Sequence, residues 1–217
     1  TGNTASGTFY VFNKKEQSAP IVFIHGVGLT YEIWQPQLDF FKSYSNLSYD
    51  ILGHGKSSLK KQNINFDDFS EQLIELINEL KIEKIHLVGF SIGSLIARNF
   101  ATRYSERLQS LILLGSIYKR SEQQQKTVNE RFEQAKKELK LSSQALKRWF
   151  TDKYLENNPD TYKKISSILS ANNMTNFLKV YELFVRHKND EDFEKIYCKT
   201  LVMTGENDIG STIEMSQ

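Results

Sequence analysis

The sequence predicts an α/β fold with a doubly wound, mostly parallel sheet and an inserted all-helical segment. Short apolar runs alternate with stretches of helical periodicity, which is typical of strands joined by crossover helices. The runs at 21–24 and 111–114 are apolar throughout, as expected for strands that are buried on both faces. Between about Tyr118 and Phe193 the strand signals vanish, and they resume at Thr200. The helical segment is therefore expected to interrupt the sheet.

Six short runs rich in β-branched, aliphatic or aromatic residues are the expected strands: 8–12, 21–24, 47–50, 85–88, 111–114 and 200–204. A helix is expected from Phe66 to Leu80, because apolar residues recur there on one face. Asn65 is its expected N-cap, and acidic residues follow in the first turn. Another helix is expected from Ile92 to Tyr104.

The segment before the last expected strand is interpreted as four short helices. Helix breaks are expected at 141–143, 157–159 and 171–173, with Pro159 suited to a first helical turn. The chain is accordingly divided into residues 1–117 and 196–217, which build the sheet-bearing core, and an all-helical insertion at 118–195.

The composition narrows the classes of function. With 28 Lys and Arg against 26 Asp and Glu, the net charge of +2 creates no broad field for a nucleic acid or an anionic membrane. No apolar run approaches the roughly 18 residues of a membrane-spanning helix. The lone Cys198 excludes a disulfide framework and a multi-cysteine metal site, which favours a reducing, cytoplasmic location. Assembly with further copies of the chain is left open.

The most informative motif is Gly89-Phe90-Ser91-Ile92-Gly93. It lies between an expected strand and an expected helix, the context in which a G-x-S-x-G sequence forms a sharp turn with an exposed serine. The glycines allow strand and helix to approach closely. The backbone N–H of Ile92, at the helix N-terminus, would then point toward a developing oxyanion. The alternative is an ordinary strand-to-helix turn built from small residues.

Two further loops follow expected strands. His25-Gly26-Val27-Gly28 can form a tight turn, and the N–H of Val27 is a candidate second oxyanion donor. The loop at 50–57 carries alternating glycines and short polar side chains. Asp50 and Ser57 are expected to bond to nearby backbone there, so a structural role is favoured for this loop.

In these motifs the chain resembles the α/β-hydrolase fold, in the cap-containing group of serine hydrolases and esterases. Four segments carry the resemblance over nearly the whole chain, in the same order and spacing: His25-Gly26, Asp50 with the loop 53–57, Gly89 to Gly93, and Gly205 to Asp208. The resemblance implies a serine nucleophile at Ser91 and a cap at the helical insertion. It also implies an acid after the late strand that orients a catalytic histidine.

By this resemblance Asp208 is the acid of the triad. A carboxylate at the end of a parallel strand would lie at the same sheet edge as Ser91, where ligands bind in open α/β sheets. The alternative for Asp208 is a turn residue or a helix N-cap, since a helix can begin near Thr212. Glu206 is a weaker candidate for the acid.

A serine nucleophile needs a base, and none of the four histidines fits. His25 and His54 belong to loops, His86 belongs to the far end of a strand, and His187 is expected on a solvated helix face. In the family the histidine follows one more helix and strand, which are absent here, so the chain as given is expected to be inactive. Three explanations stay open: the natural protein continues beyond Gln217, the protein binds a small molecule without turnover, or His187 or His25 has been recruited.

The resemblance implies hydrolysis of a small carboxylic ester or related acyl compound through an acyl-enzyme, with no metal or organic cofactor. A noncatalytic small-molecule-binding protein is the alternative. Five aromatic residues of the insertion could face the substrate or merely pack together: Trp149, Phe150, Phe177, Tyr181 and Phe184. Four of its cations are expected on solvated faces: Lys119, Arg120, Lys136 and Lys137.

Overall fold

A seven-stranded sheet runs through the computed structural model of the chain, which describes residues 1–15, 18–138, 144–188 and 192–217. In spatial order the strands are β1 (Gly2–Asn3), β2 (Phe9–Asn13), β4 (Asn46–Tyr49), β3 (Ile21–Ile24), β5 (Ile85–Phe90), β6 (Leu108–Leu114) and β7 (Lys199–Met203). The neighbours from β4 to β7 are parallel, whereas β1 and β2 pair antiparallel at one edge. The expectation of a mostly parallel sheet is confirmed.

The order of the strands creates a switch point between β3 and β5. From β3 the chain crosses to β4 on one side, and it then returns to β5 on the other side of β3. The loops after β3 and β5 therefore leave the sheet in opposite directions. In open α/β sheets, ligands bind in the crevice at the carboxyl ends of such strands. The switch point directs attention to the loops that begin at His25 and Ser91.

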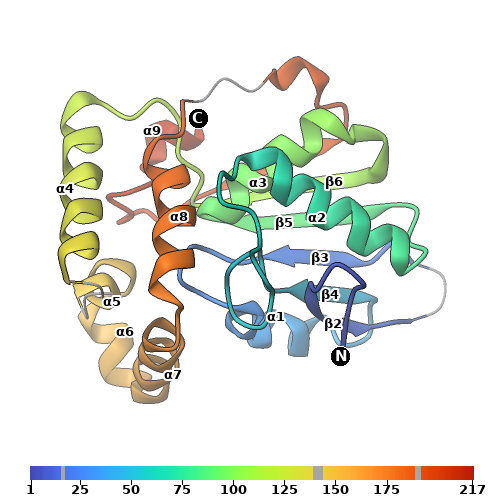
Figure 1. Ribbon diagram of the computed structural model, residues 1–217, viewed down its shortest axis with the longest axis horizontal. Helices are drawn as coiled ribbons and strands as arrows, with labels where there is room; N and C mark the ends of the chain where they lie inside the picture. Colours follow the sequence, from blue (N-terminus) through green and yellow to red (C-terminus); the bar gives the residue numbers. More distant parts are fainter. Residues whose placement is uncertain (16–17, 139–143, 189–191) are drawn as a thin grey trace.

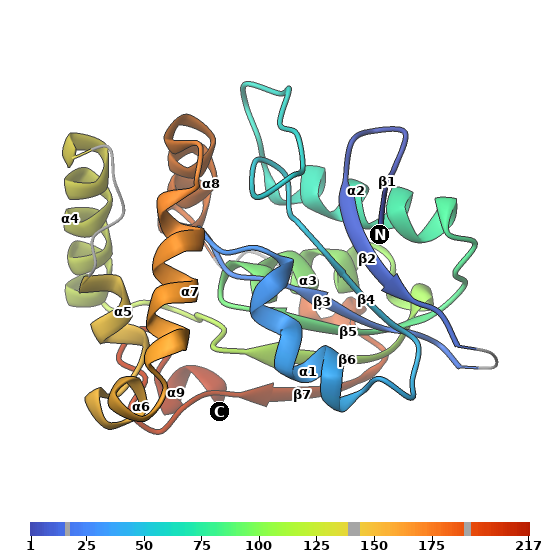
Figure 2. The ribbon, with the colours of Figure 1, turned by 90° about the horizontal axis from the view of Figure 1, so that it is seen from below.

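Helices cover both faces of the sheet (Figure 2). The helices α2 (Phe66–Glu79) and α3 (Ile92–Arg103) pack on one face, and η1 (Tyr31–Trp34) and α1 (Gln35–Phe40) lie on the other. Residues of β3 alternate between the two layers. Val22 and Ile24 belong to the core beneath α2 and α3, while Phe23 packs against Trp34 on the opposite face.

The N-terminus of α2 matches its prediction. Asn65 Oδ1 accepts a hydrogen bond from the Asp68 N–H at 3.1 Å, and Asp68 Oδ2 accepts one from the Asn65 N–H at 2.8 Å. This reciprocal capping box satisfies two backbone donors that the first helical turn leaves unpaired. The helix thus starts at the residue where the sequence pattern places it.

Five described helices follow β6 where the sequence predicts four: α4 (Glu122–Glu138), α5 (Gln144–Trp149), α6 (Asp152–Asn157), α7 (Pro159–Ser170) and α8 (Met174–Val185). The extra boundary arises because Thr151 caps a new helix, its Oγ1 accepting the Tyr154 N–H at 3.2 Å. The expected breaks at 157–159 and 171–173 are present, and the break at 141–143 lies outside the described residues. In Figure 1 these helices stand beside the carboxyl ends of the strands, with α4 against α8.

The remaining elements are short. They are η2 (Ser105–Arg107), η3 (Phe193–Lys195) and α9 (Ile213–Ser216). The sequence did not predict β1, and it placed the start of β6 three residues too late, at Leu111 instead of Leu108. Every residue of β7 is exposed. No helix in the described ranges combines the length and apolarity that crossing a membrane requires.

Candidate active site

Ser91 lies on a strained turn between β5 and α3. Its φ of 56° and ψ of −121° fall in a region that residues other than glycine rarely occupy. The flanking glycines make the turn possible, because a Cβ on Gly89 would lie 2.2 Å from the carbonyl oxygen of Gly93. The Ser91 N–H donates to the carbonyl oxygen of Leu114 at 2.9 Å, which fixes the turn to the end of β6.

Close packing joins this turn to the loop after β3. A Cβ on Gly93 would lie 2.5 Å from the carbonyl oxygen of Ile24, so the start of α3 rests directly on the end of β3. Within the described residues no hydrogen bond uses the N–H of Val27 or of Ile92. The two expected oxyanion donors are therefore both free at the switch point of the sheet, and Ile92 opens a helix whose N-terminus favours negative charge.

His25 and His54 are held inside the loops after β3 and β4. His25 Nε2 accepts the Ile51 N–H at 3.1 Å, and His54 Nε2 accepts the Gly28 N–H at 2.8 Å. Each Nδ1 faces a carbonyl oxygen, at 2.8 Å from His25 to Gly26 and at 3.3 Å from His54 to Leu52, so each ring is neutral with its proton on Nδ1. Recruitment of His25 as a base is incompatible with this bonding.

Burial lowers the pKa of both imidazoles. The pKa of His25 falls to about 4, and the pKa of His54 falls to about 3 because the nearby His25 adds to the effect of burial. A histidine with so low a pKa stays unprotonated at neutral pH, which suits a fixed hydrogen-bonding role.

Asp50 has the structural role that the sequence predicts. Its buried carboxylate accepts the Tyr31 N–H and the Lys56 N–H, each at 2.9 Å. Burial raises the pKa of Asp50, while these two backbone bonds and the Lys56 charge oppose the rise. Ser57 Oγ likewise accepts the Phe9 N–H at 2.9 Å. These bonds fix the conformation of the loop that follows β4.

Asp208 lies in the loop between β7 and α9. Its Oδ1 accepts the N–H groups of Gly210 at 2.8 Å and Ser211 at 3.0 Å. Ser211 Oγ in turn donates to the Gly115 carbonyl oxygen at 2.8 Å, which ties the loop to the end of β6 beside the Ser91 turn. The helix N-cap is Thr212 rather than Asp208. Glu206, the weaker candidate, is exposed.

A cavity of about 380 Å³ opens above Ser91 and Val27. Four of the five aromatic candidates line it: Trp149, Phe177, Tyr181 and Phe184. Phe150 does not, and it stacks on Tyr154 instead. Gly210 and Ser211 also line the cavity, so the loop of Asp208 reaches it.

Three arginines line the same cavity: Arg120, Arg131 and Arg148. The expectation that Arg120 lies on a solvated face is wrong, because its guanidinium donates to the carbonyl oxygens of Phe184 and Val185, each at 3.1 Å. Burial lowers its pKa to about 10. Sequence reasoning missed Arg131 and Arg148, because nothing in the sequences of α4 and α5 marks which arginine lines a cavity.

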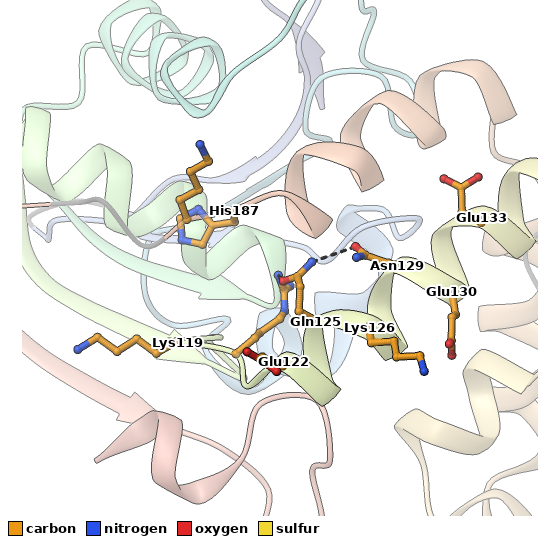
Figure 3. Close-up of a pocket in the computed structure, with 10 residues that line it drawn as sticks. Lys119, Glu122, Gln125, Lys126, Asn129, Glu130, Glu133 and His187 are labelled. Carbon is orange, nitrogen blue, oxygen red and sulfur yellow. Dashed lines mark hydrogen bonds between the residues drawn. The ribbon is translucent and has the colours of Figure 1, made fainter.

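His187 lines a different hollow, the wider groove of about 860 Å³ drawn in Figure 3. The groove lies along α4, where Gln125 Nε2 donates to Asn129 Oδ1 at 3.0 Å, and its rim carries charges of both signs. The His187 ring meets Phe66 with centroids 5.1 Å apart and is half-buried, so the expectation of a solvated helix residue is wrong. Ser91 does not line this groove.

The fourth histidine is also remote from Ser91. His86 pairs with Ile21 at the start of β5, and its Nδ1 lies 2.8 Å from Ser110 Oγ. The chain has four histidines, all within the described ranges, and none of them lines the cavity above Ser91. In the described part of the chain, no three His, Cys, Asp or Glu side chains form a group that could hold a metal ion.

The sequence and the fold are similar to those of known proteins. A sequence model of the alpha/beta hydrolase fold matches residues 19–216. The chain is 31% identical over 212 residues to (E)-2-((N-methylformamido)methylene)succinate hydrolase of Acinetobacter baylyi, covering 96% of this chain and 80% of that protein. It is 23% identical over 218 residues to 3-oxoadipate enol-lactonase 2 of the same organism, covering 100% and 81%. The enol-lactonase structure from Burkholderia xenovorans LB400 matches with a TM-score of 0.86 at 22% identity, covering 96% and 82%.

Proposed function

The chain belongs to the α/β-hydrolase fold family, and we propose that it is a serine hydrolase that forms an acyl-enzyme on Ser91. One observation carries the proposal: Ser91 lies on a strained turn, at a cavity, next to two backbone N–H groups that no described residue uses. A strained serine at the carboxyl edge of the sheet is the arrangement that presents Oγ to a substrate.

The reaction proceeds in two steps. Ser91 Oγ attacks the substrate carbonyl carbon and gives its proton to a base, while the N–H groups of Val27 and Ile92 stabilise the oxyanion. The tetrahedral intermediate collapses, the base returns the proton to the leaving group, and an acyl-enzyme remains. Water, deprotonated by the same base, then attacks the acyl carbon. The bond from this carbon to Ser91 Oγ breaks, the base returns its proton to Oγ, and the acid is released. Asp208 orients the base and stabilises its cation.

None of the four histidines in residues 1–217 is placed to act as this base. His25 and His54 have both ring nitrogens bonded to backbone, His86 lies at the opposite end of β5, and His187 lines the other groove. The loop of Asp208 reaches the cavity through Gly210 and Ser211, where a histidine could lie between Asp208 and Ser91.

The substrate is an ester, a lactone or a related acyl compound of small size. A hydrolase and two lactonases are among the relatives by name, and the cavity volume of about 380 Å³ is at the small end of ligand sites. The described helices α4, α5 and α8 line this cavity. In this proposal they belong to a cap that shapes the specificity.

A fluorophosphonate probe tests the nucleophile. We expect the full-length protein to be labelled at Ser91, as mass spectrometry of the tryptic peptide would establish, and we expect Ser91→Ala to abolish labelling. Thr127→Val is a matched control, since this hydroxyl also lines the cavity but donates to the Gln123 carbonyl oxygen.

Absence of labelling in the folded full-length protein would overturn the hydrolase proposal. It would favour a binding protein on the same scaffold, for which Ser91→Ala leaves ligand affinity unchanged.

A further inference from the structure

The cavity above Ser91 has an excess of positive charge. Its lining includes Arg120, Arg131 and Arg148, and Glu138 is the one carboxylate among the described lining residues. Glu138 lies seven residues after Arg131 on α4, which separates the two by about 10 Å along the helix axis. Its carboxylate accepts a hydrogen bond from Gln134 Nε2 at 2.9 Å. Among the described residues, no ion pair joins Glu138 to any of the three arginines.

Arg120 already has partners. Its guanidinium donates to the last carbonyl groups of α8, at Phe184 and Val185, and it stacks on the Phe184 ring at 4.7 Å. A cation at a helix C-terminus satisfies carbonyl oxygens that the helix leaves unpaired. Arg120 thus attaches the start of α4 to the end of α8.

Arg131 and Arg148 differ from Arg120 in this respect. Among the described residues, neither guanidinium has a carboxylate within ion-pair distance or a hydrogen-bond partner. The two charges are close enough to interact, since burial and the Arg131 charge together lower the pKa of Arg148. The charges of Arg131 and Arg148 also oppose the rise that burial causes in the pKa of Tyr181. Two like charges therefore line the cavity with Tyr181, and neither is paired with a carboxylate in the described part of the chain.

We propose that the acyl substrate carries a carboxylate, separate from its scissile carbonyl, and that Arg131 and Arg148 bind it. The inference rests on the proposed function, because both arginines line the cavity that contains Ser91. A guanidinium presents a planar fork that matches a carboxylate in a bidentate bond. An anion between the two forks removes their mutual repulsion and fixes the distance from the carboxylate to the carbonyl at Ser91.

A binding experiment tests this without turnover. In calorimetry on the full-length protein, glutarate is expected to bind at least about tenfold more tightly than its neutral diamide, glutaramide. Arg131→Gln and Arg148→Gln should each weaken glutarate binding by about tenfold and leave glutaramide unaffected. Lys136→Gln is the matched control, because Lys136 is exposed on the same helix, pairs with Glu133 and does not line the cavity.

A kinetic experiment connects the site to hydrolysis. With monomethyl glutarate the arginine variants should raise KM about tenfold with a smaller change in kcat, and with dimethyl glutarate they should leave KM unchanged. Equal binding of glutarate and glutaramide, or glutarate binding that both variants retain, would overturn the carboxylate site even where the probe labels Ser91. Arginine-dependent glutarate binding without Ser91 labelling would support the site and overturn the hydrolase proposal instead.

Discussion

Gly93 is the residue at which the active-site turn tolerates least change. A Cβ there would lie 2.5 Å from the Ile24 carbonyl oxygen and 2.7 Å from that of His25, and both atoms are backbone. Ala is the better helix former, but this preference is at most about 1 kcal/mol and backbone cannot move aside as a side chain can. We therefore expect Gly93→Ala to lower the free energy of unfolding by about 1–3 kcal/mol and to reduce fluorophosphonate labelling of Ser91.

Urea denaturation of the variant measures the loss. Gly205→Ala is the matched control, since a Cβ at Gly205 meets nothing within 4 Å, and its stability should change by less than about 0.5 kcal/mol. Equal stability of the Gly93 variant and the wild type would mean that α3 can move away from β3.

At the residue scale, the residues that build local turns and loops were predictable from the sequence. Which helical side chains line the cavity was not. The turn at Ser91 was identifiable because glycines at fixed spacing are a steric requirement of the turn itself. Asp50 was identifiable as an acceptor of backbone hydrogen bonds, because short polar side chains in a glycine-rich loop commonly bond to nearby backbone. Arg131 was missed because α4 is polar around most of its circumference, so which of its faces turns inward depends on packing against α8. Arg148 lies on the short helix α5, whose six residues give no clear periodicity.

The N-terminus of α2 can be tested as an element. Asn65→Ala removes one half of the capping box and leaves the Asp68 N–H without its acceptor. We expect a loss of about 1 kcal/mol in the free energy of unfolding, measured by urea denaturation. Asn65→Asp should retain most of the stability, because a carboxylate caps the same N–H and favours the positive end of the helix.

Asn63→Ala serves as the control, since Asn63 is exposed two residues before the cap. If the Asn65 and Asn63 variants lost the same stability, the capping box would contribute nothing measurable.

Helices and strands were predicted correctly where the residues of a single segment determine its secondary structure. The expected strands at 21–24 and 85–88 correspond to β3 and β5, because their apolar runs are buried in the middle of the sheet. The two-residue strand β1 is too short to give any periodicity. The boundary between α5 and α6 was missed because it depends on a single capping hydroxyl, that of Thr151.

At the scale of the whole molecule, His25 and His54 connect folding to pH. Their folded-state pKa values, about 4 and about 3, lie below the ordinary value of 6.5. Between these values the unfolded chain binds protons that the folded chain does not, so stability is complete above about pH 6.5 and falls as the pH falls toward 4. The raised pKa of Asp50 has the opposite sign and offsets part of the loss near its own titration.

Urea midpoints at pH 7, 6, 5 and 4.5 measure this effect. His54→Gln, whose amide oxygen can still accept the Gly28 N–H, should be less stable at pH 7 but should lose stability less steeply below pH 6.5. A midpoint that stays constant between pH 7 and pH 5 would contradict the assignment of these two groups.

The arrangement of the whole sheet was predictable only in part. Alternating strand and helix signals gave the parallel class, but the order that places β3 between β4 and β5 follows from pairing between distant segments. The same holds for the cavity. Its walls combine the turn at Ser91 with helices that lie up to about ninety residues later in the chain, and no local pattern encodes such proximity.

The bonding of the two loop histidines has a consequence for chemical modification. Reagents that acylate imidazoles, such as diethyl pyrocarbonate, attack a free nitrogen lone pair. At His25 and His54 that lone pair belongs to a buried Nε2 that already accepts a backbone N–H. Both rings are thereby shielded in the folded protein, so inactivation by such a reagent would originate at an imidazole outside these two loops.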